Sequence, residues 1–269
     1  MLKKNIAVWS AFTASLPDEE PFIGSKYPDE QIVRFLATWK RRRRNDYFIA
    51  NIGCEDDDAG VTRVKALEIN PLNPVHLEAM YGFGFEPQTA SYMPAAAANT
   101  RKGLERLDLS QITVKNWDGM TLPYADASMD AVLSTKSAYY QANQDRFVSE
   151  VARIVRPGGE IFLYYLSADH GYMDSIDHID GNIYCLNKRH PNPALVGAYV
   201  FLASKEALRE LWHPYFDGSI KYFEFSTYQT FSSFYVVTGQ RRPNELKGYH
   251  ETSDEEALPR WGAYLYAPT

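Results

Sequence analysis

Residues 130–166 read DAVLSTKSAYYQANQDRFVSEVARIVRPGGEIFLYYL, and this stretch decides the fold. Asp130–Ser134 and Glu160–Leu166 are apolar runs of strand length, and the second is apolar enough to be buried on both faces. Between them, Gln144–Val155 has its apolar residues at helical spacing. Arg156-Pro157-Gly158-Gly159 ends this helix, because proline cannot continue it and glycine accepts the left-handed conformation. A strand, a helix and a second strand predict a βαβ unit in a parallel sheet.

The same alternation extends to both sides of this stretch. We expect further strands at Val64–Ile69, after Phe83–Glu86, and at Ile112–Lys115, Lys221–Ser226 and Ser233–Gly239. We expect helices at Asp29–Arg44, Val75–Tyr81, Ala95–Leu107 and, capped by Ser204, Lys205–Leu211. Residues 168–198 are polar and without clear periodicity, so they are expected to form an irregular insert. The pattern predicts one α/β domain with helices on both faces of the sheet.

Composition narrows the functional class. The chain has 269 residues, a formal net charge of −6 and two cysteines, Cys54 and Cys185. This length can bury a core without disulfides or metal, and the negative charge argues against nucleic acid as the main partner. The arginine run 41–44 is interpreted as the solvated end of a helix, since an acidic run follows at 55–58. We expect a cytoplasmic protein without a membrane span, because residues 6–14 are a poor match to a signal peptide.

Two motifs resemble those of the class I S-adenosylmethionine (SAM) dependent methyltransferases of the type 11-like group. Residues 116–134 read NWDGMTLPYADASMDAVLS, with the acidic residue, the Leu-Pro-aromatic step and the following strand at the family's spacing. Residues 150–159 read EVARIVRPGG and resemble the family's helix end. The resemblance covers about residues 27–241. It implies a Rossmann-like, doubly wound sheet of about seven strands, mostly parallel with an antiparallel last strand.

This resemblance also divides the chain. Residues 1–45 correspond to a helical lead-in or lid, residues 46–241 to the methyltransferase-like domain with its insert at 168–198, and residues 242–269 to a C-terminal tail.

The family's glycine-rich cofactor loop can be placed in two frames. One frame starts the loop at Asn51, which makes Glu68 the acid of the second strand. The other starts it at Glu68, with Ser91 at the end of the second strand. The acids are separated by about 20 residues in dinucleotide folds, and the two frames give 68 − 51 = 17 and 91 − 68 = 23. The second frame also leaves 118 − 91 = 27 residues before Asp118, close to the family's usual gap, and we adopt it.

In this frame the cofactor loop departs from the family pattern. Asn70, Leu72 and Pro74 occupy the positions of the three glycines, where the backbone passes close to the cofactor. Ser91 replaces the acid that usually accepts hydrogen bonds from the ribose hydroxyls, and a neutral acceptor contributes less than a charged one. The loop is therefore degenerate, and binding of SAM competes with loss of cofactor binding as an interpretation.

The resemblance implies a set of cofactor-binding residues. Asp118 would meet the adenine amino group, with Gly119 and Met120 along the ring. Ser134 and Thr135 follow the fourth strand, at the edge where ligands of open α/β sheets bind. The full set is Glu68, Asn70, Leu72, Ser91, Tyr92, Asp118, Gly119, Met120, Ser134 and Thr135.

Catalytic residues are less sharply indicated. A general base that deprotonates an acceptor hydroxyl or amine could come from the insert or from the aromatic segment after the fourth strand. The candidates are His170, His178, His190 and Tyr139. Asp177, His178 and Asp180 match no metal site of defined geometry, so no metal is predicted.

The leading hypothesis is a SAM-dependent methyltransferase that methylates an oxygen or nitrogen of a small-molecule acceptor. The alternative is a non-catalytic protein of methyltransferase fold that binds another ligand or a protein partner. No nucleic acid or membrane is expected as a partner, and a homodimer is compatible with the sequence.

Overall fold

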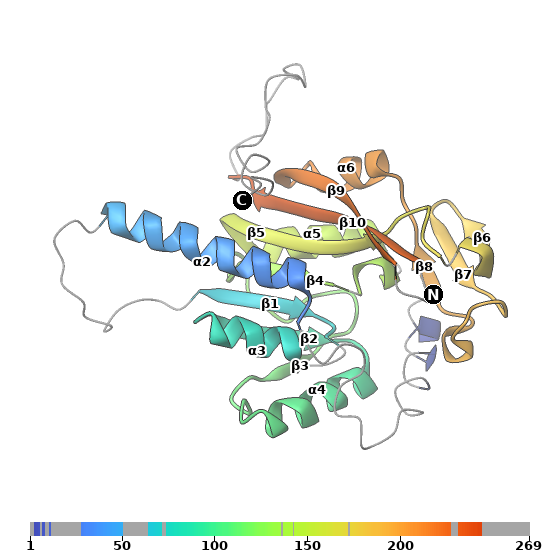
Figure 1. Cartoon of the computed structure of the whole chain (residues 1–269), viewed down its shortest axis with the longest axis horizontal. Coiled ribbons are helices and arrows are strands. Elements are labelled where there is room, and N and C mark those ends of the chain that lie inside the picture. Colours follow the sequence, from blue (N-terminus) through green and yellow to red (C-terminus); the bar gives the residue numbers. More distant parts are fainter. Residues whose placement is uncertain are drawn as a thin grey trace, which may run out of the picture.

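The computed structural model describes residues 3–5, 7–8, 11, 28–50, 64–71, 74–135, 137–141, 143–171, 173–226 and 231–243. Seven strands form one sheet in the order β3-β2-β1-β4-β5-β10-β9 (Figure 1). Neighbouring strands from β3 to β5 are parallel, whereas β10 runs antiparallel to both β5 and β9. The predicted mostly parallel sheet with an antiparallel last strand is confirmed.

The elements follow the sequence pattern closely. The main-sheet strands are β1 (Lys65–Ile69), β2 (Glu86–Ser91), β3 (Val114–Asn116), β4 (Met129–Ser134), β5 (Val155–Leu166), β9 (Phe216–Ser226) and β10 (Phe231–Arg241). The helices are α2 (Glu30–Ala50), α3 (Val75–Gly82), α4 (Pro94–Arg106), α5 (Gln144–Ile154) and α6 (Lys205–Trp212). Helix α2 continues six residues past the expected end at Arg44 and past the expected domain boundary at 45.

The position of β1 decides between the two frames of the cofactor loop. β1 lies in the middle of the sheet, between β2 and β4, which is the place of the first strand of a doubly wound sheet. β2 follows it in the chain after one helix and ends at Ser91. Glu68 therefore lies near the end of the first strand, as the second frame requires. Asn51, which starts the rejected frame, lies outside the described residues.

Helices cover both faces of the sheet. Figure 1 shows α2 and α3 over one face and α5 and α6 over the other, and each pair is in contact. Ile32, Leu36 and Trp39 form the fully buried stripe of α2 at helical spacing. The ring of Trp39 stacks on Phe85 with centroids 5.1 Å apart, so α2 is fixed over the start of β2.

The connection from α5 to β5 contains a close backbone approach. β5 begins at Val155, five residues before the predicted Glu160, and the Pro-Gly-Gly segment forms an irregularity in its pairing with β4. A Cβ at Gly159 would lie 2.8 Å from the carbonyl oxygen of Asp130. Only glycine fits at this position, which explains part of the motif that decided the fold.

The insert after β5 is ordered, contrary to the expectation of an irregular segment. β6 (Ile176–Asp180), β7 (Ile183–Leu186) and β8 (Tyr199–Phe201) form a small antiparallel sheet. A backbone bridge between Leu166 and Leu202 joins the start of the insert to its end. β6 is an exposed edge strand with three polar residues, so no continuous apolar run announced it. Figure 1 places this small sheet beyond the carboxyl end of β5.

A membrane span was not expected from the sequence. In the part of the chain that the structure describes, no helix is long and apolar enough to cross a bilayer.

Candidate cofactor and acceptor site

The parallel topology brings most of the predicted site residues to one edge of the sheet. Glu68 and Asn70 lie at the carboxyl end of β1, Ser91 and Tyr92 at that of β2, and Ser134 at that of β4. The 118–120 segment follows β3 at the same edge, and Thr135 follows Ser134. Leu72 lies outside the described residues. Ligands of open α/β sheets bind at this edge.

Asn70 keeps the backbone conformation for which the family uses glycine. Its φ is +51°, in the left-handed region that asparagine tolerates better than most residues. The Asn70 side-chain oxygen accepts the backbone N–H of Tyr92 at 3.0 Å, which joins the loops after β1 and β2. The hydroxyl of Thr100 on α4 donates to the carbonyl of Pro71 at 3.0 Å. These hydrogen bonds stabilise the backbone of the loop after β1 in a conformation that glycine would adopt without such support.

Ser91 serves the turn into α4. Its Oγ accepts the backbone N–H of Met93 at 3.2 Å. Its hydroxyl donates to the Met93 carbonyl at 3.3 Å, which leaves little hydrogen-bonding capacity for a ribose. The position of the usual ribose-binding acid is therefore occupied by a residue that stabilises its own loop.

Four buried polar atoms at this edge have no hydrogen-bond partner among the described residues. They are Glu68 Oε2, Asn70 Nδ2, Tyr92 Oη and Trp117 Nε1. Buried polar atoms are nearly always hydrogen-bonded, and leaving one without a partner costs about 1–3 kcal/mol. Trp117 packs edge-on against Tyr92 with centroids 5.3 Å apart, and burial raises the pKa of Tyr92 so that it stays protonated. Three donors and one carboxylate oxygen at the ends of β1, β2 and β3 fit a polar, ring-containing ligand such as SAM.

Glu68 is held by a histidine that the sequence did not single out. Glu68 is almost fully buried, and its Oε1 lies 2.7 Å from Nδ1 of His76 in the first turn of α3. The other ring nitrogen accepts the backbone N–H of Asp29 at 3.1 Å. The sequence offered one signal for this contact: His76 follows Glu68 by eight residues, at the start of the next predicted helix.

Asp118 is exposed and lies in a tight turn. Its Oδ1 accepts the backbone N–H groups of Thr121 at 2.8 Å and Met120 at 2.7 Å. These hydrogen bonds lower the pKa of Asp118, so its carboxylate stays charged. Gly119 has φ +78°, and Met120 beside it is 45% exposed. An anionic acceptor beside an exposed apolar side chain suits an aromatic ring that carries an amino group.

Helix α5 fixes this turn from behind. The Arg146 guanidinium donates to the Met120 carbonyl at 3.3 Å and to the Thr121 hydroxyl at 3.0 Å. Arg153 donates to the carbonyls of Leu122 and Tyr124 and forms an ion pair with Glu150 at 2.8 Å. Glu150 in turn accepts the backbone N–H of Leu122 at 2.9 Å. The two motifs that carry the family resemblance are thus parts of one hydrogen-bonded framework.

The end of β4 is joined to the end of β1 through two hydroxyl groups. Ser137 donates to the Ile69 carbonyl at 2.8 Å. Its oxygen lies 2.7 Å from Oγ of Ser134, and because the Ser137 hydrogen is already committed, Ser134 is the donor in that contact. Ser134 therefore helps to hold the carboxyl ends of β4 and β1 together.

The four catalytic candidates lie in different surroundings. Tyr139 is buried in a short helix (Ala138–Tyr140) after β4, and its ring packs on Tyr140 with centroids 4.6 Å apart. His170 is buried in the turn after β5, and burial followed by the charge of His190 lowers the pKa of His170 to about 4. His178 lies on the exposed edge strand β6 and contacts the Gly181 carbonyl at 2.9 Å.

The N-terminal part of the chain takes part in covering this side. Asn5 is fully buried, and its amide donates to the carbonyls of Tyr140 and Tyr199, both at 3.0 Å. Its side-chain oxygen accepts the Tyr199 N–H at 2.6 Å. Asn5 thereby joins the segment after β4 to the small sheet of the insert.

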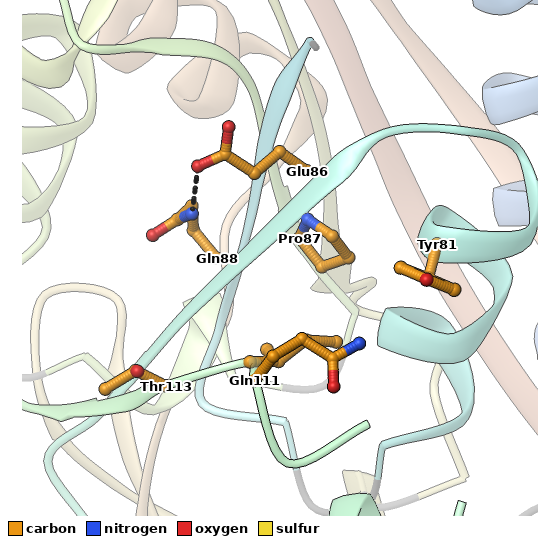
Figure 2. Close-up of a pocket in the computed structure, with 7 residues that line it drawn as sticks. Tyr81, Glu86, Pro87, Gln88, Gln111 and Thr113 are labelled. Atoms are coloured by element: carbon orange, nitrogen blue, oxygen red, sulfur yellow. Dashed lines mark hydrogen bonds between the residues drawn. The ribbon is translucent and has the colours of Figure 1, made fainter. Parts of the chain in front are cut away.

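A pocket of 160 Å³ lies at the opposite edge of the sheet (Figure 2). It is lined by Tyr81 at the end of α3, by the first residues of β2 and by Gln111–Thr113 before β3. Glu86 and Gln88 share a hydrogen bond of 3.0 Å in its wall. Because it lies at the amino end of β2, this pocket is separate from the cofactor edge. No group of three His, Cys, Asp or Glu side chains in the described ranges could hold a metal ion.

Comparisons with known proteins agree with this architecture. A family model described as a methyltransferase domain matches residues 81–163. A fatty-acid O-methyltransferase of Mycolicibacterium smegmatis is 32% identical over 80 residues, which are 30% of this chain and 29% of that protein. An O-methyltransferase of Penicillium expansum is 26% identical over 87 residues, 32% of this chain and 31% of that protein. The matches span less than a third of the length of these relatives.

Solved structures share the fold over most of the chain. A SAM-dependent methyltransferase of Methanosarcina mazei has a TM-score of 0.54 at 16% identity, over 72% of this chain and 97% of its own. A protein described with the conversion of a disulfide bond into a thioacetal group during echinomycin biosynthesis also has a TM-score of 0.54, at 17% identity, over 89% and 94% of the two chains.

The family match begins at residue 81, after the loop in which the glycines are replaced, and it includes β2, the Asp118 turn and α5. The match and the sheet topology confirm the resemblance drawn from the two motifs: residues 81–163 match a methyltransferase domain, and the chain has the fold of the class I SAM-dependent methyltransferases.

Proposed function

We propose that the protein transfers a methyl group from SAM to an oxygen or nitrogen of a small-molecule acceptor. The observation that carries this proposal is the group of four buried polar atoms without partners at the carboxyl ends of β1, β2 and β3. A protein that kept only the fold would be expected to lose such atoms, because each one destabilises the protein while no ligand meets it.

The residues at this edge fit the polar groups of SAM. When bound, SAM supplies an electrophilic methyl group on a sulfonium centre. Glu68 Oε2 would accept a hydrogen bond from a cationic or donor group of SAM, while Asn70, Tyr92 and Trp117 offer donors that replace the usual ribose-binding acid. Asp118 would accept the adenine amino group, with Met120 along the ring. Neutral donors in place of one carboxylate account for the departure at Ser91.

We assign binding of the methyl acceptor to the insert at 168–198. Burial and the charge of His190 lower the pKa of His170 to about 4, so at pH 7 its neutral ring can accept a hydrogen bond from an acceptor hydroxyl group and orient it for methyl transfer. Its ring packs edge-on against Phe234 of β10 with centroids 5.2 Å apart, which restrains its orientation. Correct positioning of donor and acceptor supplies much of the rate in an in-line displacement.

Calorimetric titration with S-adenosylhomocysteine tests the cofactor site. We expect binding in the micromolar range, corresponding to about −8 kcal/mol. Asp118→Ala should weaken binding by about tenfold, because a charged acceptor contributes about 1.5–3 kcal/mol. Asn51→Ala, the matched control from the rejected frame, should leave binding unchanged. Absence of binding at millimolar ligand would favour the alternative, a non-catalytic protein that binds another ligand or a protein partner.

Transfer of a labelled methyl group from SAM tests the activity. Long-chain carboxylic acids, phenols and amines should be assayed separately, and the first class is included because one relative is a fatty-acid O-methyltransferase. His170→Gln should reduce transfer without altering S-adenosylhomocysteine binding, whereas His178→Gln on the exposed strand should change neither. Equal rates for both variants would remove His170 from the reaction.

A further inference from the structure

His76 connects three elements at the cofactor edge. Its Nδ1 lies 2.7 Å from Glu68 Oε1 at the end of β1, and its Nε2 accepts the backbone N–H of Asp29 at 3.1 Å. The imidazole itself belongs to the first turn of α3. Its side chain is 13% exposed and that of Glu68 is 1% exposed, so both contacts are largely shielded from water.

The two contacts assign the proton on the ring. A backbone N–H can only donate, so Nε2 must carry a lone pair. In the neutral imidazole the proton then lies on Nδ1, from which it is donated to Glu68 Oε1. With Oε1 engaged in this way, Oε2 is the carboxylate oxygen that remains without a partner among the described residues.

Asp29 also fixes the start of helix α2. Its Oδ1 accepts the backbone N–H of Gln31 at 2.9 Å, as expected for a capping aspartate. The same oxygen accepts the hydroxyl of Tyr164 on β5 at 2.8 Å. The start of α2 is therefore joined to β5 through its side chain and to α3 through its backbone.

We propose that His76 is a positioning residue that orients the Glu68 carboxylate for the cofactor and couples the cofactor site to the docking of α2. The inference rests on the function proposed above. The ring holds one oxygen of Glu68 and leaves the other directed to the ligand, while the second ring nitrogen holds the first residue before α2. Ligand binding at Glu68 Oε2 restrains the same carboxylate and thereby stabilises the whole contact from β1 to α2.

Two substitutions of His76 test whether its hydrogen bonds are needed for cofactor binding. Glutamine keeps one donor and one acceptor but cannot take up a proton, whereas alanine keeps neither. His76→Ala should weaken S-adenosylhomocysteine binding by about tenfold or more, since a hydrogen bond to a charged group contributes about 1.5–3 kcal/mol. His76→Gln should stay within about threefold of the unmodified protein.

Hydrogen exchange of the Asp29 amide measures how firmly the start of α2 is held by His76. Exchange should be slow in the unmodified protein, slower still with S-adenosylhomocysteine, fast in His76→Ala and slow again in His76→Gln. Glu68→Gln keeps an acceptor for the ring but loses the charge, so it should weaken binding and leave Asp29 protected. If His76→Ala binds normally, or if His76→Gln binds as weakly as His76→Ala, the positioning role is overturned.

A measurement without substitution covers the case in which His76→Ala does not fold. Nitrogen-15 spectra of the histidine rings, with His76→Gln used for assignment, should show the Nδ1-protonated tautomer at His76. A ring protonated on Nε2 would overturn the proposal. If the unmodified protein binds neither SAM nor S-adenosylhomocysteine, the proposed function fails, and that outcome differs from normal binding that is indifferent to His76.

Discussion

The loops after β1 and after β3 face the same edge of the sheet but keep the family pattern to different degrees. The loop after β1 has Asn70 and Pro74 where the family has glycine, and its chain path is supported by an asparagine side chain and by Thr100. The loop after β3 keeps its motif and is bonded to α5 through Arg153 and Glu150. The loop after β3 thus keeps both its framework and Asp118, whereas the loop after β1 has lost the glycines and is supported by side-chain hydrogen bonds instead.

The largest effect should come from breaking the framework on the retained side. Arg153→Ala leaves Glu150, which is 6% exposed, without its ionic partner and frees two carbonyls of the loop. The free energy of unfolding should fall by about 3 kcal/mol, because the Glu150 carboxylate loses a charged donor and two loop carbonyls lose theirs. Urea unfolding measures it. Arg146→Ala on the exposed side of the same helix is the control, with an expected loss of about 1 kcal/mol or less. Equal losses of unfolding free energy in the two variants would show that Arg153 does not hold the loop after β3 to α5.

A second prediction concerns the changed loop. Asn70→Ala removes the hydrogen bond to Tyr92 and places an alanine at φ +51°, so the free energy of unfolding should fall by about 2 kcal/mol. Asn70→Gly loses the same hydrogen bond but accepts the backbone conformation, and its loss should be about half as large. If glycine were the more destabilising of the two, the left-handed conformation of Asn70 would be contradicted.

Tyr92 gives a prediction in which stability and binding change in opposite directions. Tyr92→Phe removes a buried hydroxyl that has no partner, so the ligand-free protein should gain about 1 kcal/mol of unfolding free energy. The same change should weaken S-adenosylhomocysteine binding about threefold to tenfold, in line with one neutral hydrogen bond. Thermal unfolding with and without ligand measures both. Tyr165→Phe on β5, which removes a buried hydroxyl that donates to Gln144 at 2.9 Å, is the control and should lower the free energy of unfolding. A stability gain without any loss of binding would place the ligand elsewhere.

The smallest effect is a pH dependence on the acceptor side. Burial, with the charge of His190, lowers the pKa of His170 to about 4 in the folded protein, against about 6.5 in an unfolded chain. The unfolded state therefore binds more protons between these values, and stability is lost as the pH falls from about 6.5 to about 4. Unfolding by urea at several pH values should show a shallower loss for His170→Asn than for the unmodified protein. His178→Asn, on the exposed strand, should retain the full slope.

Much of the fold was predictable because its signals are local. Helix α5 has a clear helical period of apolar residues, and Ser204 caps α6 as expected, its hydroxyl oxygen accepting the Ala207 N–H. β1 and β4 are mainly apolar and of ordinary strand length. The three short strands of the insert escaped prediction because β6 is exposed on both sides and β8 has only three residues. Strand pairing at such lengths is decided by contacts that a local pattern does not contain.

The sequence predicted the location of the site better than the roles of its residues. The frame choice placed Glu68, Ser91 and Asp118 near the ends of three successive parallel strands, where the fold brings them together. Trp117 and His76 were missed, because their importance follows from burial and from contacts between distant segments.

The bridge between Leu166 and Leu202 has a consequence for how such a protein can diversify. The insert leaves the core and returns to it at neighbouring points, so it is a module closed at its base. The entropy of closing a loop grows only slowly with its length, so residues can be gained or lost in this module at little expense to the sheet beneath. Residues can therefore be gained or lost on one side of the molecule while the register of the central strands stays the same, and under the proposed function such changes would alter the acceptor preference.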